Sequence, residues 1–381
     1  MHARRRLNDV PVLTDIDAQY LQRAVELAGN GLGRVHPNPL VGAVLVRDGS
    51  VLGEGWHEAY GGPHAEVNAI AASGGDTEGA TLYVSLEPCC HTGKTGPCTT
   101  AIAEAGIARV VVAADDPAEH AAGRGLGILR DDGIDVDMAG GDVARRARLL
   151  NQGHRKHART GRPFVLFKSA MSLDGKVATA AGDSKWISGE LSRERAHRWR
   201  SHMDAVVVGI GTALADDPRL TSRVDGVERQ PRRIVFDSLA RLPLDSQLVA
   251  QAEEVPLTVV VSRAAPRAAT EALHNAGADV LLATGQHEPA RVVSALDGLG
   301  QRGIKSMLLE GGPHLAGAFL DAGEIDELRL FIAPVLVGSR NARDPLEGVG
   351  AERIGEAVRA TGLECHRIGE DVLLTARLAE W

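Results

Sequence analysis

The sequence predicts an α/β protein of two domains, and three observations support this prediction. Apolar segments of strand length alternate with segments of helical pattern along the first part of the chain, which is typical of a three-layer α/β/α domain. The alternation begins again after residue 163, without an internal periodicity that would indicate repeats. A basic, polar stretch that ends in proline, GDVARRARLLNQGHRKHARTGRP, separates the two series. We therefore expect domains at residues 14–158 and 163–381.

The elements expected in the first domain follow one another in the order of an α/β sheet. They are a helix over 18–27, a strand at VGAVLV (41–46), a helix over 64–72, a strand at TLYVSL (81–86), a helix from Cys98 through TTAIAEAG, and a strand at RVVVAA (109–114). Pro63 suits a helix start because its missing N–H would be unpaired there. Residues 87 onward leave the carboxyl end of a strand, which is the usual place for a site in such a sheet.

The second domain is predicted from a series of apolar strands with helical segments between several of them. The strands are FVLFKSAMS (164–172), DAVVVGIG (204–211), RRIVFDS (232–238), LTVVVS (257–262), ADVLLATG (278–285), IKSMLLEGG (304–312) and LRLFIAPVLVG (328–338). No G-x-G-x-x-G fingerprint opens this domain, so an ordinary dinucleotide fold is not indicated. The EGG run at 310–312 instead places glycine amides at a helix start near Pro313, which suits a phosphate.

The strongest chemical signal is PHAEV at 63–67 followed by SLEPCCHTGKTGPC at 85–98. His64, Cys89 and Cys98 are the ligand types of a catalytic zinc, which leaves a fourth position for water and lowers the pKa of that water to about 7. Nucleobase deaminases add a glutamate two residues after the histidine that moves protons without binding the metal, and Glu66 stands at that position. These residues predict one hydrolytic zinc site per chain.

A structural zinc site is the alternative, and it would need a fourth ligand from His91 or Cys90. The EPC context of Cys89 and the presence of Glu66 favour the catalytic site. Cys90 is then interpreted as a small buried or spare thiol, and Cys365 as a core residue.

The two metal-binding cysteines enclose eight residues, CHTGKTGP, where the usual deaminase signature has two. His91, Lys94 and Thr95 make this insert suitable for contacting an anionic substrate. With PNPLVGAVLV at 37–46, which contains Asn38, and with EGWH at 54–57 and AGRG at 122–125, the spacing resembles the pyrimidine deaminase of riboflavin biosynthesis. This resemblance implies a cytidine-deaminase-like first domain. Leu40 and Cys90 depart from the family, which often has Asn and Ser there.

The second domain resembles the reductase of riboflavin biosynthesis, through KSAMSLDGKVA (168–178), GDSKWIS (182–188), GTALADDPRLTSR (211–223) and LLEGGPHLAGAFL (308–320). That family is similar to dihydrofolate reductase in fold and uses NADPH. The resemblance places substrate contacts on Ser184, Arg200, Leu220, Arg223 and Glu310. It places cofactor contacts on Ala170, Trp186, Thr212, Asp216, Ser238 and the turn of Gly312, Pro313, His314, Leu315, Ala316, Gly317 and Ala318.

Several of these residues also make physical sense alone, although each has a plainer interpretation. Arg200 and Arg223 suit a bidentate phosphate clamp, and Trp186 offers a flat face to a nicotinamide or ribose. Lys168, Asp174 and Asp217 are candidates for positioning or proton handling, while simple turn chemistry also explains the two aspartates.

Composition excludes other classes of function. The chain has 381 residues, a formal net charge of −8 and 3% aromatic residues, which argues against a nucleic-acid partner. Its four cysteines, three of them in one cluster, indicate no disulfide framework. No apolar run approaches the roughly 20 residues of a membrane span, and the opening MHARRRLNDVPVLTDID lacks the apolar region of a signal peptide. We expect a cytoplasmic enzyme that forms a homo-oligomer.

The two resemblances together cover nearly the whole chain, in the order of the fused bifunctional proteins of riboflavin biosynthesis. They imply zinc-dependent hydrolytic deamination of a diamino-(phosphoribosylamino)pyrimidinone to the corresponding uracil with release of ammonia. NADPH-dependent reduction of the ribosyl group to the ribityl form follows. A deaminase of another small base and a regulatory protein that binds metabolites without turnover remain the alternatives. The eight-residue insert disfavours the first, and the zinc set with Glu66 disfavours the second.

Overall fold

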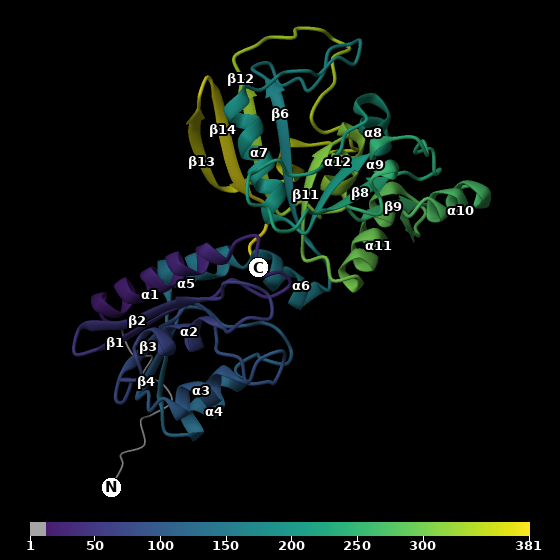
Figure 1. Ribbon diagram of the computed structural model, residues 1–381. Helices are drawn as coiled ribbons and strands as arrows, with labels where there is room; N and C mark the ends of the chain where they lie inside the picture. The colour runs from purple at the N-terminus through teal and green to yellow at the C-terminus, as the bar shows by residue number, and fades with distance from the viewer. Residues whose placement is uncertain (1–12) are drawn as a thin grey trace. The chain divides into compact units, whose positions relative to one another are not determined.

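The protein is described here from a computed structural model over residues 13–381 (Figure 1). The first 12 residues lie outside the described part, and with them most of the stretch that is predicted not to be a signal peptide. The chain divides into two compact units, one that runs to Arg159 and includes Trp381, and one over Thr160–Glu380. Trp381, assigned to the second domain from the sequence, therefore packs with the first unit, where its carbonyl accepts hydrogen bonds from Gln152 and Arg155.

The first unit is built on one five-stranded sheet. Its elements are α1 (Asp15–Ala28), η1 (Gly29–Gly31), β1 (Gly42–Arg47), β2 (Ser50–Trp56), α2 (Ala65–Ala72), β3 (Thr81–Val84), α3 (Cys98–Glu104), β4 (Arg109–Val112), α4 (Arg124–Asp131), β5 (Asp135–Met138), α5 (Gly141–Leu150) and α6 (Gln152–Thr160). The strand order is β2-β1-β3-β4-β5. β1 is antiparallel to β2 and to β3, and β3, β4 and β5 are parallel to one another.

Helices cover both faces of this sheet, as the sequence predicts. On one face Ala69 of α2, Ile102 of α3 and Leu129 of α4 pack against strand residues such as Val110. On the other face α1 and α5 lie side by side and pack against β1, β3 and β4 (Figure 1). The expected three-layer α/β/α architecture is confirmed. β2 and β5 are additional strands that were not predicted from the sequence.

Glycines let helix α2 lie directly on strand β2. A Cβ atom on Gly53 would come within 2.2 Å of the Ala69 carbonyl oxygen, and one on Gly55 within 2.4 Å of the Ala69 nitrogen. Side chains at these positions would therefore push the helix away from the strand. The backbones touch because both residues are glycine, and this contact fixes the position of the helix that carries Glu66.

A buried ionic cluster ties α1 to the strands below it. The Asp17 carboxylate is 3% exposed and accepts hydrogen bonds from Tyr83 and from Arg109, both at 2.8 Å. Arg109 also donates to Asp137 at 2.8 Å, so it joins α1, β4 and β5. Burial alone raises the pKa of Asp17, but the hydrogen bond from Arg109 and those from Thr14 and Tyr83 outweigh it and lower that pKa well below its usual range.

The second unit contains one nine-stranded mixed sheet. Its elements are β6 (Phe164–Ser172), α7 (Glu190–His202), β7 (Ala205–Gly209), α8 (Ile210–Asp216), β8 (Arg232–Phe236), α9 (Gln247–Ala250), β9 (Leu257–Val261), α10 (Arg267–Asn275), β10 (Asp279–Leu282), α11 (Glu288–Gln301), β11 (Ser306–Gly311), α12 (Pro313–Asp321), β12 (Glu327–Ala333), η2 (Ile354–Glu356), β13 (Thr361–Ile368) and β14 (Asp371–Arg377). The strand order is β10-β9-β8-β7-β11-β6-β12-β14-β13.

Strands β10 to β12 in this order are parallel, whereas β14 and β13 run antiparallel at one edge. β7 and β9 are fully buried and are continuous apolar runs, which is why the sequence predicts them well. Their carboxyl ends meet along one edge of the sheet, so the loops that follow β6, β7, β8, β9 and β11 surround a common space.

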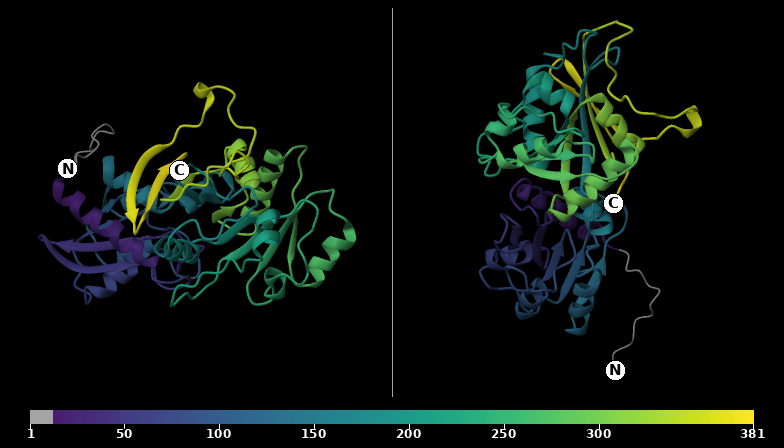
Figure 2. Two further views of the ribbon diagram at one scale, coloured as in Figure 1. Left: turned by 90° about the horizontal axis from the view of Figure 1, so that it is seen from above. Right: turned by 90° about the vertical axis from the view of Figure 1, so that its right-hand side faces the viewer.

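The antiparallel edge is more exposed than expected. All but one of the residues of β13 are exposed, so Cys365, predicted to lie in the core, is on the surface. The prediction was wrong because β13 is an edge strand with no layer of helices over it. Figure 2 shows the segment between β12 and β13 standing away from the sheet, with η2 along it. Across residues 13–381, no helix combines the length and the apolar character that a membrane crossing requires.

Replacing Asp17 by asparagine should lower the free energy of unfolding of the first unit by about 2 kcal/mol at pH 7, because Arg109 loses its buried counter-charge. Folding lowers the pKa of Asp17 below the unfolded value of about 3.9, so the charge stabilises the fold above that pH and stops doing so as the pH falls. Urea unfolding between pH 7 and pH 3 measures this effect. The difference between variant and parent should shrink toward pH 3.

The matched control is Asp76→Asn, which removes an exposed carboxylate paired with Arg47. Its side chain is 71% exposed, so we expect a change within about 0.5 kcal/mol. An equal loss of unfolding free energy from both substitutions would show that the burial of Asp17 does not strengthen its interaction with Arg109.

Candidate active sites

His64, Cys89 and Cys98 come together in the first unit as the sequence predicts. Their ligand atoms all lie within 4.8 Å of one another. The His64 Nδ1 atom is 3.2 Å from the Cys98 sulfur and 3.4 Å from the Cys89 sulfur. Tetrahedral zinc with metal–sulfur bonds of about 2.3 Å and metal–nitrogen bonds of about 2.0–2.1 Å sets such atoms roughly 3.5 Å apart. The donor set and its spacing therefore fit a zinc ion.

Three different elements position these ligands. His64 is the N-cap of α2, Cys89 lies on the loop after β3, and Cys98 is the first residue of α3. The Cys98 amide donates to the Cys89 sulfur at 3.4 Å, and the Thr99 amide donates to the Cys89 carbonyl at 3.2 Å. The start of α3 therefore holds Cys89 in place before any metal is considered.

The two thiols have opposite protonation tendencies. Hydrogen bonds from Cys98 and His64 lower the pKa of the Cys89 thiol, whereas the hydrogen bond to Cys89 and burial raise that of Cys98. One thiolate is thus stabilised by its surroundings, and a bound divalent cation would deprotonate the second.

Glu66 lies in the first turn of α2 beside this group. Its side chain is 2% exposed, and its Oε2 atom is buried without a hydrogen-bond partner in the structure. Burial, together with the negative charge of Cys89, raises the pKa of the carboxyl to about 7, although a metal cation would act in the opposite direction. A buried carboxyl with one unsatisfied oxygen next to three zinc ligands is the arrangement that a proton carrier needs.

His57 is a part of the site that the sequence analysis quotes only within the EGWH motif. It is 2% exposed, with Nδ1 3.0 Å from the Pro63 carbonyl oxygen and Nε2 3.0 Å from the Asn38 amide nitrogen. Because a carbonyl can only accept, Nδ1 carries the proton and Nε2 accepts from Asn38. Burial lowers the pKa of His57, which keeps the ring neutral and suited to both bonds. His57 thereby fixes the backbone immediately before His64.

Glu87 is a second residue whose role the sequence does not reveal. It is 4% exposed and accepts backbone hydrogen bonds from Gly123 at 3.0 Å and Gly125 at 3.2 Å. A Cβ on Gly125 would lie 2.2 Å from the Pro88 carbonyl oxygen, so only glycine fits there. The AGRG motif thus packs against the EPC turn that carries Cys89.

The insert between the two cysteines lies mainly in the solvent. His91 and Lys94 are exposed, and Thr95 is half-buried. The His91 ring meets that of His120 with 4.4 Å between centroids, and the Lys94 ammonium lies 4.2 Å from the Tyr60 ring centroid. Among the described residues the metal group includes neither His91 nor Cys90, whose thiol contacts the His120 carbonyl instead. The fourth position that a structural site would close is not filled by either candidate.

Leu40, where the deaminase family often has Asn, is 7% exposed and packs with Ala28 and Val35. Its backbone N–H and C=O both bond to the Asn151 side chain at 2.8 Å. The replacement of the family's Asn by Leu40 therefore lies in an apolar cluster formed by α1 and the loop before β1.

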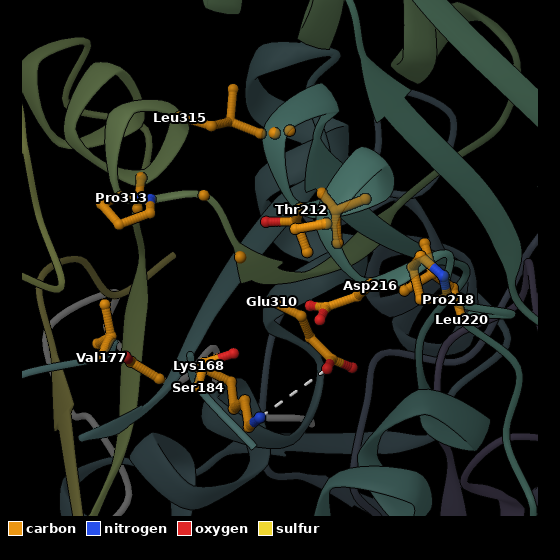
Figure 3. A pocket seen from close by; sticks show the side chains of 18 of the residues that line it. Lys168, Val177, Ser184, Thr212, Asp216, Pro218, Leu220, Glu310, Pro313 and Leu315 are labelled. Carbon is orange, nitrogen blue, oxygen red and sulfur yellow. Dashed lines mark ion pairs between the residues drawn. The ribbon is translucent and has the colours of Figure 1, made fainter. Parts of the chain in front are cut away.

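The second unit contains a large cavity at the carboxyl ends of its parallel strands, with a volume of about 1890 Å³ (Figure 3). Nearly all residues predicted to contact substrate or cofactor line it. These are Lys168, Ala170, Ser184, Trp186, Arg200, Thr212, Asp216, Leu220, Arg223, Ser238, Glu310, Gly312, Pro313, His314, Leu315, Ala316 and Ala318. The exception is Gly317, whose added Cβ would lie 2.3 Å from the Gly348 nitrogen, so it packs against the segment after β12.

A buried ionic group forms the floor of this cavity. Arg200 donates two hydrogen bonds to the Glu310 carboxylate, at 2.6 and 2.8 Å, and Lys168 lies 3.9 Å from the same carboxylate (Figure 3). Burial alone raises the pKa of Glu310, but Arg200 outweighs it and the pKa falls to about 2. Burial lowers the pKa of the Lys168 ammonium, which Glu310 opposes. Glu310 is therefore an anion at neutral pH, beside a lysine whose pKa burial lowers.

A glycine cradle follows β11 at the same edge. Gly312, with φ of 84°, is the N-cap of α12 and has no side chain to cap the helix. A Cβ on Gly312 would lie 3.6 Å from the Gly209 backbone, and one on Gly311 would lie 3.1 Å from the Thr212 hydroxyl. No side chain caps the start of α12, and this suits the pyrophosphate of a dinucleotide. The residues expected as a turn after Gly312 form the first turns of α12.

The carboxylates of the two candidate aspartates of this domain both accept hydrogen bonds from other parts of the protein. Asp174 does not line the cavity and accepts hydrogen bonds from Ser172 and from the Val337 and Gly338 amides. These bonds, led by that from Ser172, lower the pKa of Asp174 to about 2. Asp217 lines the cavity, but its carboxylate accepts from the Gln247 amide at 2.9 Å. Asp174 therefore joins the turn after β6 to the segment after β12, and Asp217 joins the end of α8 to the start of α9.

Comparisons with known proteins match both halves. The family described as "Cytidine and deoxycytidylate deaminase zinc-binding region" matches residues 14–114, and the family described as "RibD C-terminal domain" matches residues 163–374. Riboflavin biosynthesis protein RibD of Actinobacillus pleuropneumoniae is 42% identical over 367 residues, which cover 96% of each chain. That of Escherichia coli (strain K12) is 40% identical over 375 residues, 94% of this chain and 98% of the relative.

Solved structures give the same result. Acinetobacter baumannii RibD, form 1, superposes with a TM-score of 0.83 and 37% identity, covering 95% of this chain and 98% of that one. A diaminohydroxyphosphoribosylaminopyrimidine deaminase/5-amino-6-(5-phosphoribosylamino)uracil reductase from Thermotoga maritima superposes with a TM-score of 0.81 and 35% identity, with the same coverage. The predicted fold class, with a cytidine-deaminase-like first domain and a reductase second domain, is confirmed.

Cys98→Ala should lower the zinc content from about one ion per chain to background, because two protein ligands do not hold the metal firmly. Elemental analysis after gel filtration measures this. Cys90→Ala is the matched control, since it removes the neighbouring thiol that lies outside the metal group, and it should keep the full zinc content. Equal loss of zinc in both variants would make Cys90 a ligand and the site a closed, structural one.

Proposed function

This chain belongs to the RibD family of riboflavin biosynthesis proteins, and from that premise we propose that its two sites act in turn on one phosphorylated pyrimidine. It is a bifunctional enzyme with a zinc-binding deaminase domain and a reductase domain of the NADPH-dependent type. The Thermotoga maritima relative is named as a diaminohydroxyphosphoribosylaminopyrimidine deaminase and a 5-amino-6-(5-phosphoribosylamino)uracil reductase. We assign these two substrates to the domains at 14–158 and 163–381.

The observation that carries the proposal is the approach of His64, Cys89 and Cys98 within 4.8 Å beside the buried, unpaired Glu66 oxygen. A zinc ion there supplies Lewis acidity and lowers the pKa of a water toward 7. Glu66 would accept the proton of the attacking water at its buried, unpartnered Oε2 atom. It then gives the proton to the departing amine, so that ammonia leaves and the uracil forms.

Residues around the zinc ligands would orient the substrate. Asn38 is held against neutral His57, and Lys94, His91 and Thr95 lie on the exposed insert. Lys94 carries the positive charge that a phosphate on the ribosyl group would meet. The insert is therefore proposed to bind the phosphorylated end of the substrate while the base lies over the metal.

In the second unit, NADPH supplies hydride to C1′ of the ribose in its open, imine-like form. The backbone around Gly312 would hold the pyrophosphate of the cofactor, and Trp186, which is 72% exposed, would offer its ring to the cofactor. Lys168, with a lowered pKa and 3.9 Å from Glu310, is the proposed proton handler at the reduced centre. The domain's own task is to align the two reactants and exclude water.

The structure distinguishes the two arginines of the proposed phosphate clamp. Arg200 donates hydrogen bonds to the Glu310 carboxylate and, at 3.0 Å, to the Thr221 carbonyl oxygen. Arg223 lines the same cavity, is exposed, and makes no hydrogen bond or ion pair within residues 13–381. Arg223 is thus the better phosphate ligand, and Arg200 positions Glu310.

We also propose that the enzyme is a cytoplasmic homo-oligomer, with the surface around β13 as the contact between copies. β13 leaves an unpaired strand edge, and Leu363 on it is 68% exposed. Such edges are normally covered in solution. Light scattering of the purified protein gives the number of subunits.

Glu66→Gln should lower the rate of ammonia release from the diaminopyrimidine substrate about 100- to 10,000-fold, because the proton carrier is lost while the zinc ligands remain. The same variant, given the deaminated uracil, should oxidise NADPH at the normal rate. Ammonia assay, absorbance of NADPH and zinc analysis measure the three quantities.

Glu58→Gln is the control, because Glu58 is an exposed carboxylate six residues before His64. Glu58→Gln should leave the rate of ammonia release, the rate of NADPH oxidation and the zinc content unchanged. Near-normal ammonia release from Glu66→Gln with zinc still bound would show that another group carries the proton.

Arg223→Ala should raise KM for the phosphorylated uracil about 10- to 100-fold, the effect of one lost charge-assisted hydrogen bond, with a small change in kcat. With the dephosphorylated substrate the variant and the parent should agree within a few-fold. Arg219→Ala is the control, because Arg219 lines the same cavity but bonds to Gln247 at 2.7 Å. An equal loss with both substrates would remove Arg223 from the phosphate contact.

A further inference from the structure

The segment that carries Arg223 is strained where it lines the cavity of the second unit. It leaves α8 at Asp217 and reaches Arg223 by way of Leu220. Leu220 is 3% exposed and has a φ of 55°, in the left-handed region that residues with a side chain seldom adopt. Such a conformation persists only where the surrounding structure holds it. The contacts that hold this segment therefore bear on the position of Arg223.

Helix α7 makes the first of these contacts. Arg200 donates to the Thr221 carbonyl oxygen at 3.0 Å. One turn earlier in the helix, the His197 carbonyl oxygen accepts a hydrogen bond from the Ser222 hydroxyl at 2.8 Å, and Ser222 is 5% exposed. The two residues that precede Arg223 are thus attached to the helix that carries Arg200.

The side chain of Gln230 makes the second contact, and it takes up both backbone groups of Ser222. Its amide oxygen accepts from the Ser222 N–H at 2.8 Å, and its amide nitrogen donates to the Ser222 carbonyl oxygen at 3.1 Å. A neighbouring strand would pair with a residue in the same way. Gln230 stands just before β8, so this pair of bonds closes the base of the loop 223–229, whose first residue is Arg223.

Gln230 acts from outside the cavity. It is half-buried, and neither Gln230 nor Ser222 lines the cavity, whereas Arg223, next along the chain, is exposed in the cavity wall. An exposed arginine gives up much conformational freedom when it binds a ligand, and a backbone that is fixed beforehand lowers that loss. The bonds at Ser222 therefore prepare Arg223 for binding without touching the ligand.

We propose that Gln230 is a positioning residue of the reductase half, which holds the backbone at Ser222 so that Arg223 meets the phosphate of the substrate at a fixed place. The inference deepens the proposed function and rests on it, because it assumes that Arg223 binds that phosphate. The hydrogen bonds at Thr221 and Ser222 offset the strain at Leu220. Selectivity for a phosphorylated substrate thus depends on a residue that the substrate does not touch.

The test is the steady-state kinetics of the zinc-loaded full-length protein with NADPH and with the uracil substrate, phosphorylated and dephosphorylated. Gln230→Leu replaces the amide by an apolar group of similar size. It should raise KM for the phosphorylated substrate about 10-fold with little change in kcat, because Arg223 is no longer held. KM for the dephosphorylated substrate should stay that of the parent. Gln301→Leu is the matched control, because Gln301 is exposed at the end of α11 and does not line the cavity, and it should change neither KM.

The double variant with Arg223→Ala distinguishes positioning from a general structural role. If Gln230 acts through Arg223, Gln230→Leu adds nothing to the KM of Arg223→Ala, whereas additive increases in KM would overturn the inference. An equal rise in KM for both substrates in Gln230→Leu would overturn it as well. If Gln230→Leu does not fold, Gln230→Glu takes its place, since it keeps the acceptor for the Ser222 N–H and loses the donor to the Ser222 carbonyl. An unchanged KM for the phosphorylated substrate in that variant would also overturn the inference.

The Arg223→Ala variant alone separates the inference from the function beneath it. If Arg223→Ala raises KM for the phosphorylated substrate and Gln230→Leu does not, the positioning role of Gln230 is wrong and the phosphate contact stands. If Arg223→Ala leaves that KM unchanged, the phosphate contact fails and the inference fails with it.

Discussion

The zinc centre depends on direct contact between the backbones of α2 and β2. Without side chains at Gly53 and Gly55, the helix lies against the strand at a fixed height, which places His64 and Glu66 at the level of the loop after β3. The other supports act around this contact. His57 holds the chain before His64, Glu87 holds the turn at Cys89, and the start of α3 brings Cys98 to the same point. A metal site of three ligands from three elements is possible because each element is fixed independently.

The second unit keeps three charged side chains largely buried. Arg200, Glu310 and Lys168 are withdrawn from water, and such groups stabilise a fold less than apolar residues of the same volume would. Their retention at the floor of the cavity is better explained by chemistry than by stability. The apolar residues of the parallel strands bury the core around this group, in which Lys168 comes from β6 and Glu310 from the end of β11.

The parts of the fold that the sequence predicts are those in which a local pattern determines the outcome. The buried strands of both units are continuous apolar runs, and the zinc ligands stand in a spacing that few other sites use. β2 was not predicted because Gly53 and Gly55 weaken a strand pattern, although glycine in a strand is itself a sign of close backbone approach. β13 was missed, and Cys365 misplaced, because the strand alternates no apolar face toward a core.

The site residues that the sequence does not reveal are those whose partners lie far along the chain or on the backbone. Glu87 acts through the amides of Gly123 and Gly125, and Asn151 acts through the backbone of Leu40. The spacing of residues in the sequence cannot predict such bonds, because they depend on which loops meet after folding. The motifs EGWH and AGRG marked the right segments, and the structure supplies the reason that each is needed.

The insert between Cys89 and Cys98 starts and ends at metal ligands that are already bonded to each other across its base. Its middle is in solvent and carries the side chains proposed to meet the substrate. Lengthening a loop whose ends are fixed costs little, since the closure entropy grows only with the logarithm of its length. Changes in this segment can therefore alter which base the enzyme accepts without disturbing the metal. The insert is a natural place for substrate range to diverge in evolution, and for a designer to vary sequence and length together.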